Sequence, residues 1–239
     1  MRQCRIFRRI SVTAILALAS AVWCTEEVAW GQGGREANLQ YGPAESLSQI
    51  LGRPTDDSVT LSVLSASDAE AYVEFGDKTG NYSRRTETLR SNARSPFEFE
   101  LERLQPDTRY FYRLCSRRPG DGTFAVGDEY TFHTQRRPGS TFSFALQGDS
   151  HPERLGKMFS PDLYVQTMRN VEKNQPDFYL TMGDEFSLDR LVNGGTLEQA
   201  SVDRVYAQQR SFLGIVGRSS SLFLVNGNHE QAGANWLDG

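Results

Sequence analysis

The sequence predicts two folded parts of different class, a β-sandwich followed by an α/β unit with a parallel sheet. Between residues 59 and 134, apolar and polar residues alternate with period two, which is typical of strands with one buried and one wet face. Beyond Arg136-Arg137-Pro138-Gly139, strand-like and helix-like segments alternate, which favours parallel strands joined by crossover helices. A basic and then apolar segment precedes both parts.

That leading segment has the pattern of a secretory signal peptide. Four arginines lie before an apolar run from Ile10 to Trp23, which is shorter than the roughly 20 residues of a membrane span. We therefore expect residues 1–31 to be a signal peptide and linker, and the protein to be exported to a periplasm, the extracellular space or a secretory pathway. No membrane span is expected after cleavage. Unpaired thiols are favoured over a disulfide between Cys24 and Cys115.

Composition indicates a globular chain. Of its 239 residues, 38% are hydrophobic and 23% charged, as in folded domains. The formal net charge of -4 lacks the basic bias of nucleic-acid-binding proteins, so no nucleic-acid-binding signature is present.

The β part is expected to span residues 38–136. Turn signals such as Pro106-Asp107 separate several short strands, an arrangement that favours a sandwich. The string from Leu104 to Tyr112 resembles the corner of fibronectin type III domains, in which a tyrosine hydroxyl binds upstream backbone. Tyr110 is the residue expected in that role. Strands are predicted over residues 59–63, 70–75, 97–102, 109–114 and 129–134.

The α/β part is expected to span residues 141–239. Ser160-Pro161 predicts a helix start, and an apolar stripe from Val202 to Val216 predicts one face of a second helix. The predicted strands are 141–147, 177–181 and 221–226, and the predicted helices are 160–173 and 196–216.

Each predicted parallel strand ends in a glycine followed by polar residues. The three segments are Gly148-Asp149-Ser150-His151, Gly183-Asp184-Glu185-Phe186 and Gly227-Asn228-His229-Glu230. The carboxyl ends of parallel strands share one edge of a sheet, so we expect these segments to meet there. The glycines permit tight turns and close backbone approach.

The residue types suit metal ions. In extended backbone, Asp149 and His151 point the same way and can hold one cation. Asp184 has two oxygens with which to bridge two cations, and Asn228 offers a neutral oxygen that limits negative charge. In a two-metal centre a bridging hydroxide can attack phosphorus, and His229 can then protonate the leaving oxygen.

Together the motifs Asp-x-His, Gly-Asp and Gly-Asn-His-Glu resemble the calcineurin-like metallophosphoesterase superfamily, and the β part before them resembles the arrangement in purple acid phosphatases. The resemblance implies hydrolysis of a small-molecule phosphate ester by two divalent or trivalent ions (Fe, Mn or Zn). It assigns Asp149 and His151 to the first metal, Asp184 to the bridge, Asn228 to the second metal and His229 to catalysis.

The chain departs from that family in two ways. Ser187 stands where purple enzymes carry an iron-binding tyrosine, and His151 stands where they carry glycine. No Gly-His-x-His segment follows His229, so the α/β domain is expected to be partial and the sequence a piece of a longer protein.

Two other functions stay open. A secreted binding module with an incomplete metal site would need none of this chemistry. A Gly-Asp-Ser-type serine esterase would use Ser150 as nucleophile, but it needs a histidine base that no later Asp-x-x-His segment supplies. Glu185, Asp189 and Glu230 are interpreted as solvated loop charges, and among them only Glu230 is considered for a supporting role behind the ligands.

Overall fold

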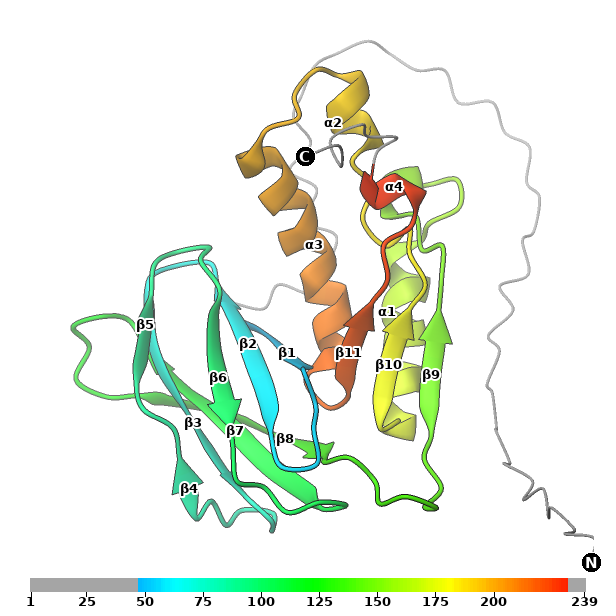
Figure 1. The fold of residues 1–239 in the computed structure, drawn as a ribbon. Helices are drawn as coiled ribbons and strands as arrows, with labels where there is room; N and C mark the ends of the chain where they lie inside the picture. Colours follow the sequence, from blue (N-terminus) through cyan, green and yellow to red (C-terminus); the bar gives the residue numbers. More distant parts are fainter. Residues whose placement is uncertain (1–46, 232–239) are drawn as a thin grey trace, which may run out of the picture.

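The structure is a computed structural model that describes residues 47–231, and its first half is built from two antiparallel sheets (Figure 1). One sheet has the order β1-β2-β6, and the other has the order β4-β3-β7-β8 with β5 also paired to β3. The strands are β1 Leu47–Gly52, β2 Val59–Ser65, β3 Ala69–Gly76, β4 Arg84–Arg85, β5 Leu89–Ser91, β6 Phe97–Leu101, β7 Arg109–Arg117 and β8 Ala125–His133.

The two sheets share one apolar core because the buried members of the alternating strands meet between them. In β6, Phe97, Phe99 and Leu101 are buried while Glu98 and Glu100 are exposed, as the alternation predicts. These three side chains belong to the same buried cluster as residues of β2, β3 and β7. Period-two burial of this kind is what removes apolar surface from water on folding.

The tyrosine corner expected from the sequence is present as a contact. The backbone N–H of Gln105 donates to the hydroxyl of Tyr110 at 2.9 Å. Tyr110 is buried and stacks on Phe132, with ring centroids 5.6 Å apart. The hydroxyl therefore ties the start of β7 to the chain that leads into it.

The second half is a parallel sheet with helices. Strands β9 and β11 both pair in parallel with the central β10, which confirms the predicted crossover topology. The elements are β9 Phe144–Gln147, η1 Pro152–Arg154, α1 Pro161–Asn174, β10 Phe178–Thr181, α2 Asp189–Asn193, α3 Gln199–Gly217, β11 Ser221–Leu224 and α4 Asn228–Gln231.

The predicted helices and parallel strands are present with shifted ends. Ser160 precedes α1 as expected, although its side chain makes no capping hydrogen bond. The expected loop over residues 227–230 instead contains the one-turn helix α4, and α2 was not predicted. Both are short helices near the carboxyl edge of the sheet, and such short segments carry little periodicity in sequence.

Both long helices belong to one buried cluster on one side of the parallel sheet. Tyr164 and Met168 of α1 and Phe212 and Val216 of α3 form this cluster with Tyr179 of β10. The paired positions Leu146, Leu180 and Phe223 of β9, β10 and β11 alternate with the clustered positions, so they share the opposite face.

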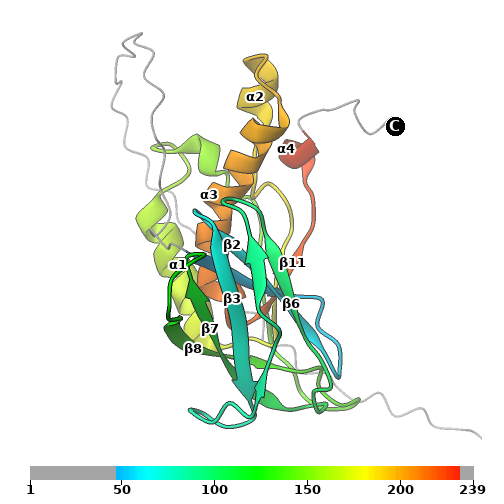
Figure 2. The same cartoon turned by 90° about the vertical axis from the view of Figure 1, so that its left-hand side faces the viewer.

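Strand β1 was missed by the sequence analysis, and it joins the two halves of the molecule. Leu51 belongs to the core between the antiparallel sheets, and Leu47 packs against that core. Ile50 packs instead against the cluster of α1 and α3. Gly217 of α3 lies against Ile50, where an added Cβ would come within 3.2 Å of the Ile50 side chain. Figure 2 shows the antiparallel sheets in front of α3.

The predicted signal peptide at 1–31 and the predicted start of the β part at residue 38 lie outside residues 47–231, which are the residues that the structure describes. Cys24 also lies outside them, whereas Cys115 is a buried free thiol whose pKa is raised by burial. No helix in the described part of the chain combines the length and the apolar character needed to cross a bilayer.

Candidate metal centre

The three glycine-containing segments meet at the carboxyl edge of the parallel sheet, where β9, β10 and β11 end (Figure 1). Backbone hydrogen bonds join the first two loops, because Asp149 N donates to Gly183 O and His151 N to Asp184 O, both at 3.1 Å. The third segment is joined to the second by the backbone N–H of His229, which donates to Asp184 Oδ1 at 3.1 Å. The loops are thus held together by backbone hydrogen bonds and by the Asp184 carboxylate.

Asp149, His151 and Asp184 form a compact group of candidate metal donors. His151 Nε2 lies 3.7 Å from Asp149 Oδ1 and 3.8 Å from Asp184 Oδ2. One donor atom from each residue lies within 4.8 Å of the others. The His151 and Asp184 side chains are nearly buried, whereas that of Asp149 is 76% exposed, so the group opens to solvent on the Asp149 side.

The expected reason for this convergence was wrong. Asp149 and His151 are not in extended backbone, because their φ angles are 56° and 47°. Asp184 also has a positive φ, of 60°. Aspartate and histidine enter this left-handed region more readily than bulky residues, but at a cost in free energy. Left-handed residues in two loops, rather than one extended segment, bring the donors together.

His229 lies beside this group and is held by Asp189. Its Nδ1 is 2.5 Å from Asp189 Oδ2, and its Nε2 is 3.5 Å from Arg154 Nη2. The rings of His151 and His229 are nearly perpendicular, with centroids 4.8 Å apart. Asp189 is therefore a paired carboxylate, which corrects its interpretation as a solvated loop charge.

Asn228 is the candidate ligand that the third segment contributes. It begins α4 between Gly227 and His229, and its side chain is exposed. A second donor group contains Glu153, which sequence reasoning missed, together with His151 and His229.

Two glycines allow the second and third loops to touch. A Cβ on Gly227 would lie 2.3 Å from Asp184 Oδ1, and one on Gly183 would lie 2.5 Å from Gly227 N. Distances this short require the neighbouring atoms to move. The expected need for glycine thus holds at these two positions, whereas Gly148 meets only ordinary contacts with Met182.

Glu230 is buried, which corrects its interpretation as a solvated charge. Its carboxylate accepts four backbone hydrogen bonds, from Asp184, Glu185, Phe186 and Gly227, at 2.6 to 2.9 Å. Backbone donors converging on a carboxylate compensate the cost of burying its charge. Glu230 therefore fixes the loop that carries Asp184 against the turn that carries His229.

Glu185 is also buried, in a polar network beneath the site rather than in solvent. Tyr164 donates to its Oε2 at 2.9 Å, and Gln147 and Gln209 amides lie 3.3 Å from its carboxylate. Burial is the main cause that raises the pKa of Glu185. The network links β9, α1 and α3 to the loop after β10.

Ser150 points toward that network. Its hydroxyl lies 3.4 Å from Gln209 Nε2, and the contacts of the described residues give it no histidine partner. A serine nucleophile needs a base within hydrogen-bond reach, so this arrangement does not support the serine esterase alternative.

Other candidate positions lack such chemistry. His133 is held at the end of its own strand, with Nδ1 2.7 Å from Thr134 O, as expected of a structural histidine.

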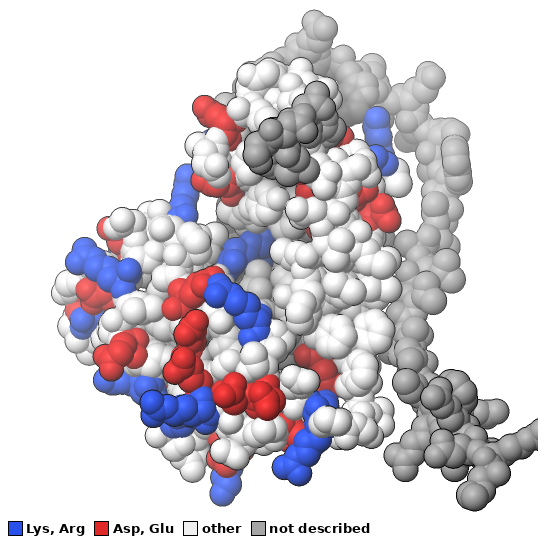
Figure 3. Space-filling model, viewed as in Figure 1, with Lys and Arg blue, Asp and Glu red and all other residues white. Residues whose placement is uncertain are grey.

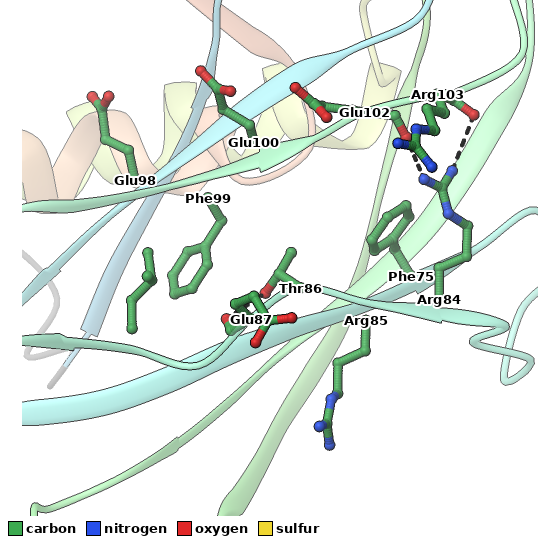
Figure 4. Close-up of a pocket in the computed structure, with 11 residues that line it drawn as sticks. Phe75, Arg84, Arg85, Thr86, Glu87, Glu98, Phe99, Glu100, Glu102 and Arg103 are labelled. Carbon is green, nitrogen blue, oxygen red and sulfur yellow. Dashed lines mark hydrogen bonds between the residues drawn. The ribbon is translucent and has the colours of Figure 1, made fainter.

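A pocket of about 320 Å³ lies beside β4 and β6 (Figure 4). Its Arg84 already donates to the carbonyl oxygens of Glu102 and Arg103 and stacks on Phe75.

The donor chemistry at the carboxyl edge fits a metal ion. Two carboxylates and one imidazole form a donor set that suits zinc, manganese or iron. Ser187, three residues after Asp184 in the same loop, is buried.

Two solved structures share this fold. The structure of PhoD aligns with a TM-score of 0.52 at 15% identity, covering 84% of this chain and 41% of that chain. The purple acid phosphatase PPD1 from yellow lupin (Lupinus luteus) seeds aligns with a TM-score of 0.52 at 19% identity, covering 76% of this chain and 35% of that chain. The described part of the chain therefore shares its fold with these two structures, and the chain spans less than half the length of either one. No known family and no curated protein matches the sequence.

Proposed function

We propose that this chain contributes to a metal-dependent phosphoesterase, in which the carboxyl edge of the parallel sheet binds two metal ions and a small-molecule phosphate ester. The observation that carries this function is the position of His151 Nε2, which faces the carboxylates of Asp149 and Asp184 at 3.7 and 3.8 Å. The shared fold of PhoD and the lupin purple acid phosphatase supports the same function.

In this proposal Asp149, His151 and Asp184 hold the first ion, Asp184 also contributes to the second, and Asn228 completes the contribution of this chain. When bound, the ions act as Lewis acids toward the phosphate ester and its nucleophile. Asp184 Oδ1 already accepts the backbone N–H of His229, which orients the carboxylate.

His229 is proposed as the proton donor to the leaving oxygen. Asp189 accepts a hydrogen bond from Nδ1, which orients the ring so that Nε2 is the nitrogen that can carry a proton to the leaving oxygen. Arg154, 3.5 Å from that nitrogen, places a positive charge where phosphoryl oxygens can be bound.

For the rest of the chain, we propose a signal peptide over 1–31, a fibronectin III-like sandwich over 38–136 and the first part of a phosphoesterase domain over 141–239 of a longer exported protein. The two antiparallel sheets around one core and the Tyr110 corner support the sandwich assignment.

The proposed function is tested with Asp184→Asn, which keeps the shape of the side chain and removes its charge. We expect metal binding by calorimetry with Mn²⁺ or Zn²⁺, and chelator-sensitive hydrolysis of nitrophenyl phosphate mono- and diesters, to fall to background while circular dichroism stays unchanged. Asp128→Asn, on the exposed side of β8, makes the same change away from the site and should preserve both.

Turnover that survives Asp184→Asn would remove the bridging role of Asp184. Failure of the unmodified chain to bind metal would instead favour a secreted binding module without a metal centre. Chelator-resistant hydrolysis blocked by a serine-directed reagent would favour the esterase alternative.

A further inference from the structure

The two ring nitrogens of His151 face different groups. Nε2 faces Asp149 and Asp184, whereas Nδ1 lies 3.0 Å from Glu153 Oε1, within hydrogen-bond distance. The His151 residue is only 5% exposed, so water competes little for either nitrogen. A neutral imidazole carries one proton, and the nitrogen that lacks it is the one able to bind a metal.

Hydrogen bonds hold the backbone on both sides of Glu153, whose Oε2 is buried without a hydrogen-bond partner among the described residues. His151 adopts a left-handed conformation, and Pro152 then begins the short helix η1. The backbone N–H of Arg154 donates to His151 O at 2.9 Å, which closes a tight turn around Glu153. Arg190 of α2 donates to the Glu153 carbonyl oxygen at 2.5 Å. Glu153 is therefore anchored on both sides of the turn, with a side chain that is 15% exposed.

Glu153 could also be read as a metal ligand, because it forms a donor group with His151 and His229. Arg154 argues against that reading. Its Nε lies 3.4 Å from Glu153 Oε1, and its Nη2 lies 3.5 Å from His229 Nε2. A cation held between Glu153 and His229 would sit next to this guanidinium and be repelled by it.

The side of His151 that faces the aspartates has no such competing charge. Within residues 47–231, neither Asp149 nor Asp184 forms an ion pair with an arginine or a lysine. The two sides of the ring thus differ in charge: Glu153 is paired with Arg154, whereas the only ion-pair partner of the two aspartates is His151 and the other hydrogen bond of Asp184 comes from the neutral backbone N–H of His229.

We propose that Glu153 is a positioning residue of the metal centre. It accepts the Nδ1 proton of His151, which orients the ring and leaves the Nε2 lone pair directed between Asp149 and Asp184. A carboxylate behind a metal-binding histidine fixes its tautomer and strengthens it as a ligand. This role rests on the proposed metal site, but the tautomer itself is a property of the metal-free chain.

The first measurement is the tautomer of His151 in the metal-free chain of 239 residues, read from the ¹⁵N shifts of its ring nitrogens at a pH where the ring is neutral. His133 and His229 are the only other histidines, so a His151→Gln variant assigns the signal. We expect the Nδ1–H form in the unchanged chain, the same form in Glu153→Gln, whose amide oxygen still accepts, and a shift toward Nε2–H in Glu153→Ala.

The second measurement is Zn²⁺ affinity by calorimetry. Glu153→Ala should weaken binding by about 10- to 100-fold, and Glu153→Gln should recover part of the loss. Glu100→Ala, which removes an exposed carboxylate from β6, is the matched control and should bind as the unchanged chain does.

Each result has a distinct meaning. An unchanged tautomer and unchanged affinity in Glu153→Ala would overturn the positioning role. Complete loss of binding in both Glu153→Ala and Glu153→Gln would also overturn it, because Glu153 would then be a ligand. If the unchanged chain binds no Zn²⁺ yet shows the expected tautomers, the proposed metal function fails while the Glu153–His151 contact stands.

Discussion

At the scale of single residues, the site is built from unusual backbone rather than from unusual side chains. The three proposed ligands of the first ion all have positive φ angles, between 47° and 60°. Such conformations persist only when surrounding contacts hold them, and here Glu230 and the backbone bonds between loops supply those contacts. Strain of this kind concentrates at functional sites, which agrees with the proposed role of this edge.

Gly227→Ala tests how closely the loops must approach. The added Cβ would lie 2.3 Å from Asp184 Oδ1, so the carboxylate and the Asp184 backbone must shift. We expect a loss of about 1–3 kcal/mol in the free energy of unfolding, measured with denaturant, and weaker Zn²⁺ binding. Gly122→Ala, where an added Cβ meets nothing within 4 Å, should change neither quantity. Equal effects of the two variants would contradict the close approach.

At the scale of elements, α3 connects the two halves of the molecule through its contact with β1. Arg210 of α3 reaches the antiparallel sheet, where its Nε donates to Ser48 Oγ at 2.8 Å and its Nη2 to Ser62 O at 2.7 Å. Burial lowers the pKa of Arg210 to about 10, so the guanidinium remains charged at neutral pH. Gly217 lets the helix lie close to β1, because an added Cβ would come within 3.2 Å of the Ile50 side chain.

Arg210→Ala should therefore weaken the contact between α3 and the antiparallel sheet. Its loss removes charge-assisted hydrogen bonds, but it also relieves the burial of a charge, so we expect a net destabilisation of about 1–3 kcal/mol. Denaturant unfolding followed by fluorescence measures this change. Arg169→Ala, on the exposed side of α1, is the control. A denaturant midpoint equal to that of the control would show that Arg210 does not stabilise the contact between α3 and the antiparallel sheet.

At the scale of the whole molecule, one face of the parallel sheet is apolar and uncovered in the described part of the chain. Leu146 and Phe223 are 46% and 42% exposed, and Phe144 stacks on Phe178 with centroids 5.2 Å apart. Figure 3 shows that the surface over these strands carries few charged side chains compared with the antiparallel half. Parallel sheets are normally covered on both faces.

An uncovered apolar face predicts dye binding and self-association of this chain. Replacing Leu146 and Phe223 together by threonine should reduce the fluorescence of a bound naphthalene sulfonate dye and lower the mass measured by light scattering, while strand propensity is kept. Val126→Thr changes an exposed strand residue of β8 and should leave both signals as they are. If dye binding persists in the double variant, the exposed apolar surface that binds the dye lies elsewhere on the molecule.

The sequence predicted the parts of the molecule that depend on local patterns. Alternation revealed β2, β3, β6, β7 and part of β8, and the spacing of glycines and polar residues indicated the three loops of the site. It missed β1, because Ser48 and Ile50 of that short strand contact α3, which lies far away in sequence, and such contacts leave no local pattern. It also missed the short helices at the edge of the sheet.

From local patterns alone, the sequence indicated the residues proposed here for chemistry and predicted that three loops would share one sheet edge, because alternation and strand order follow from local backbone geometry. The contacts of those residues follow from the packing of distant segments and could not be predicted from local patterns. Local sequence predicts solvated charges at Glu230, Glu185 and Asp189. In the structure each of them contacts a donor from a distant segment. Contacts between distant segments depend on how the elements pack, and no local pattern encodes that packing.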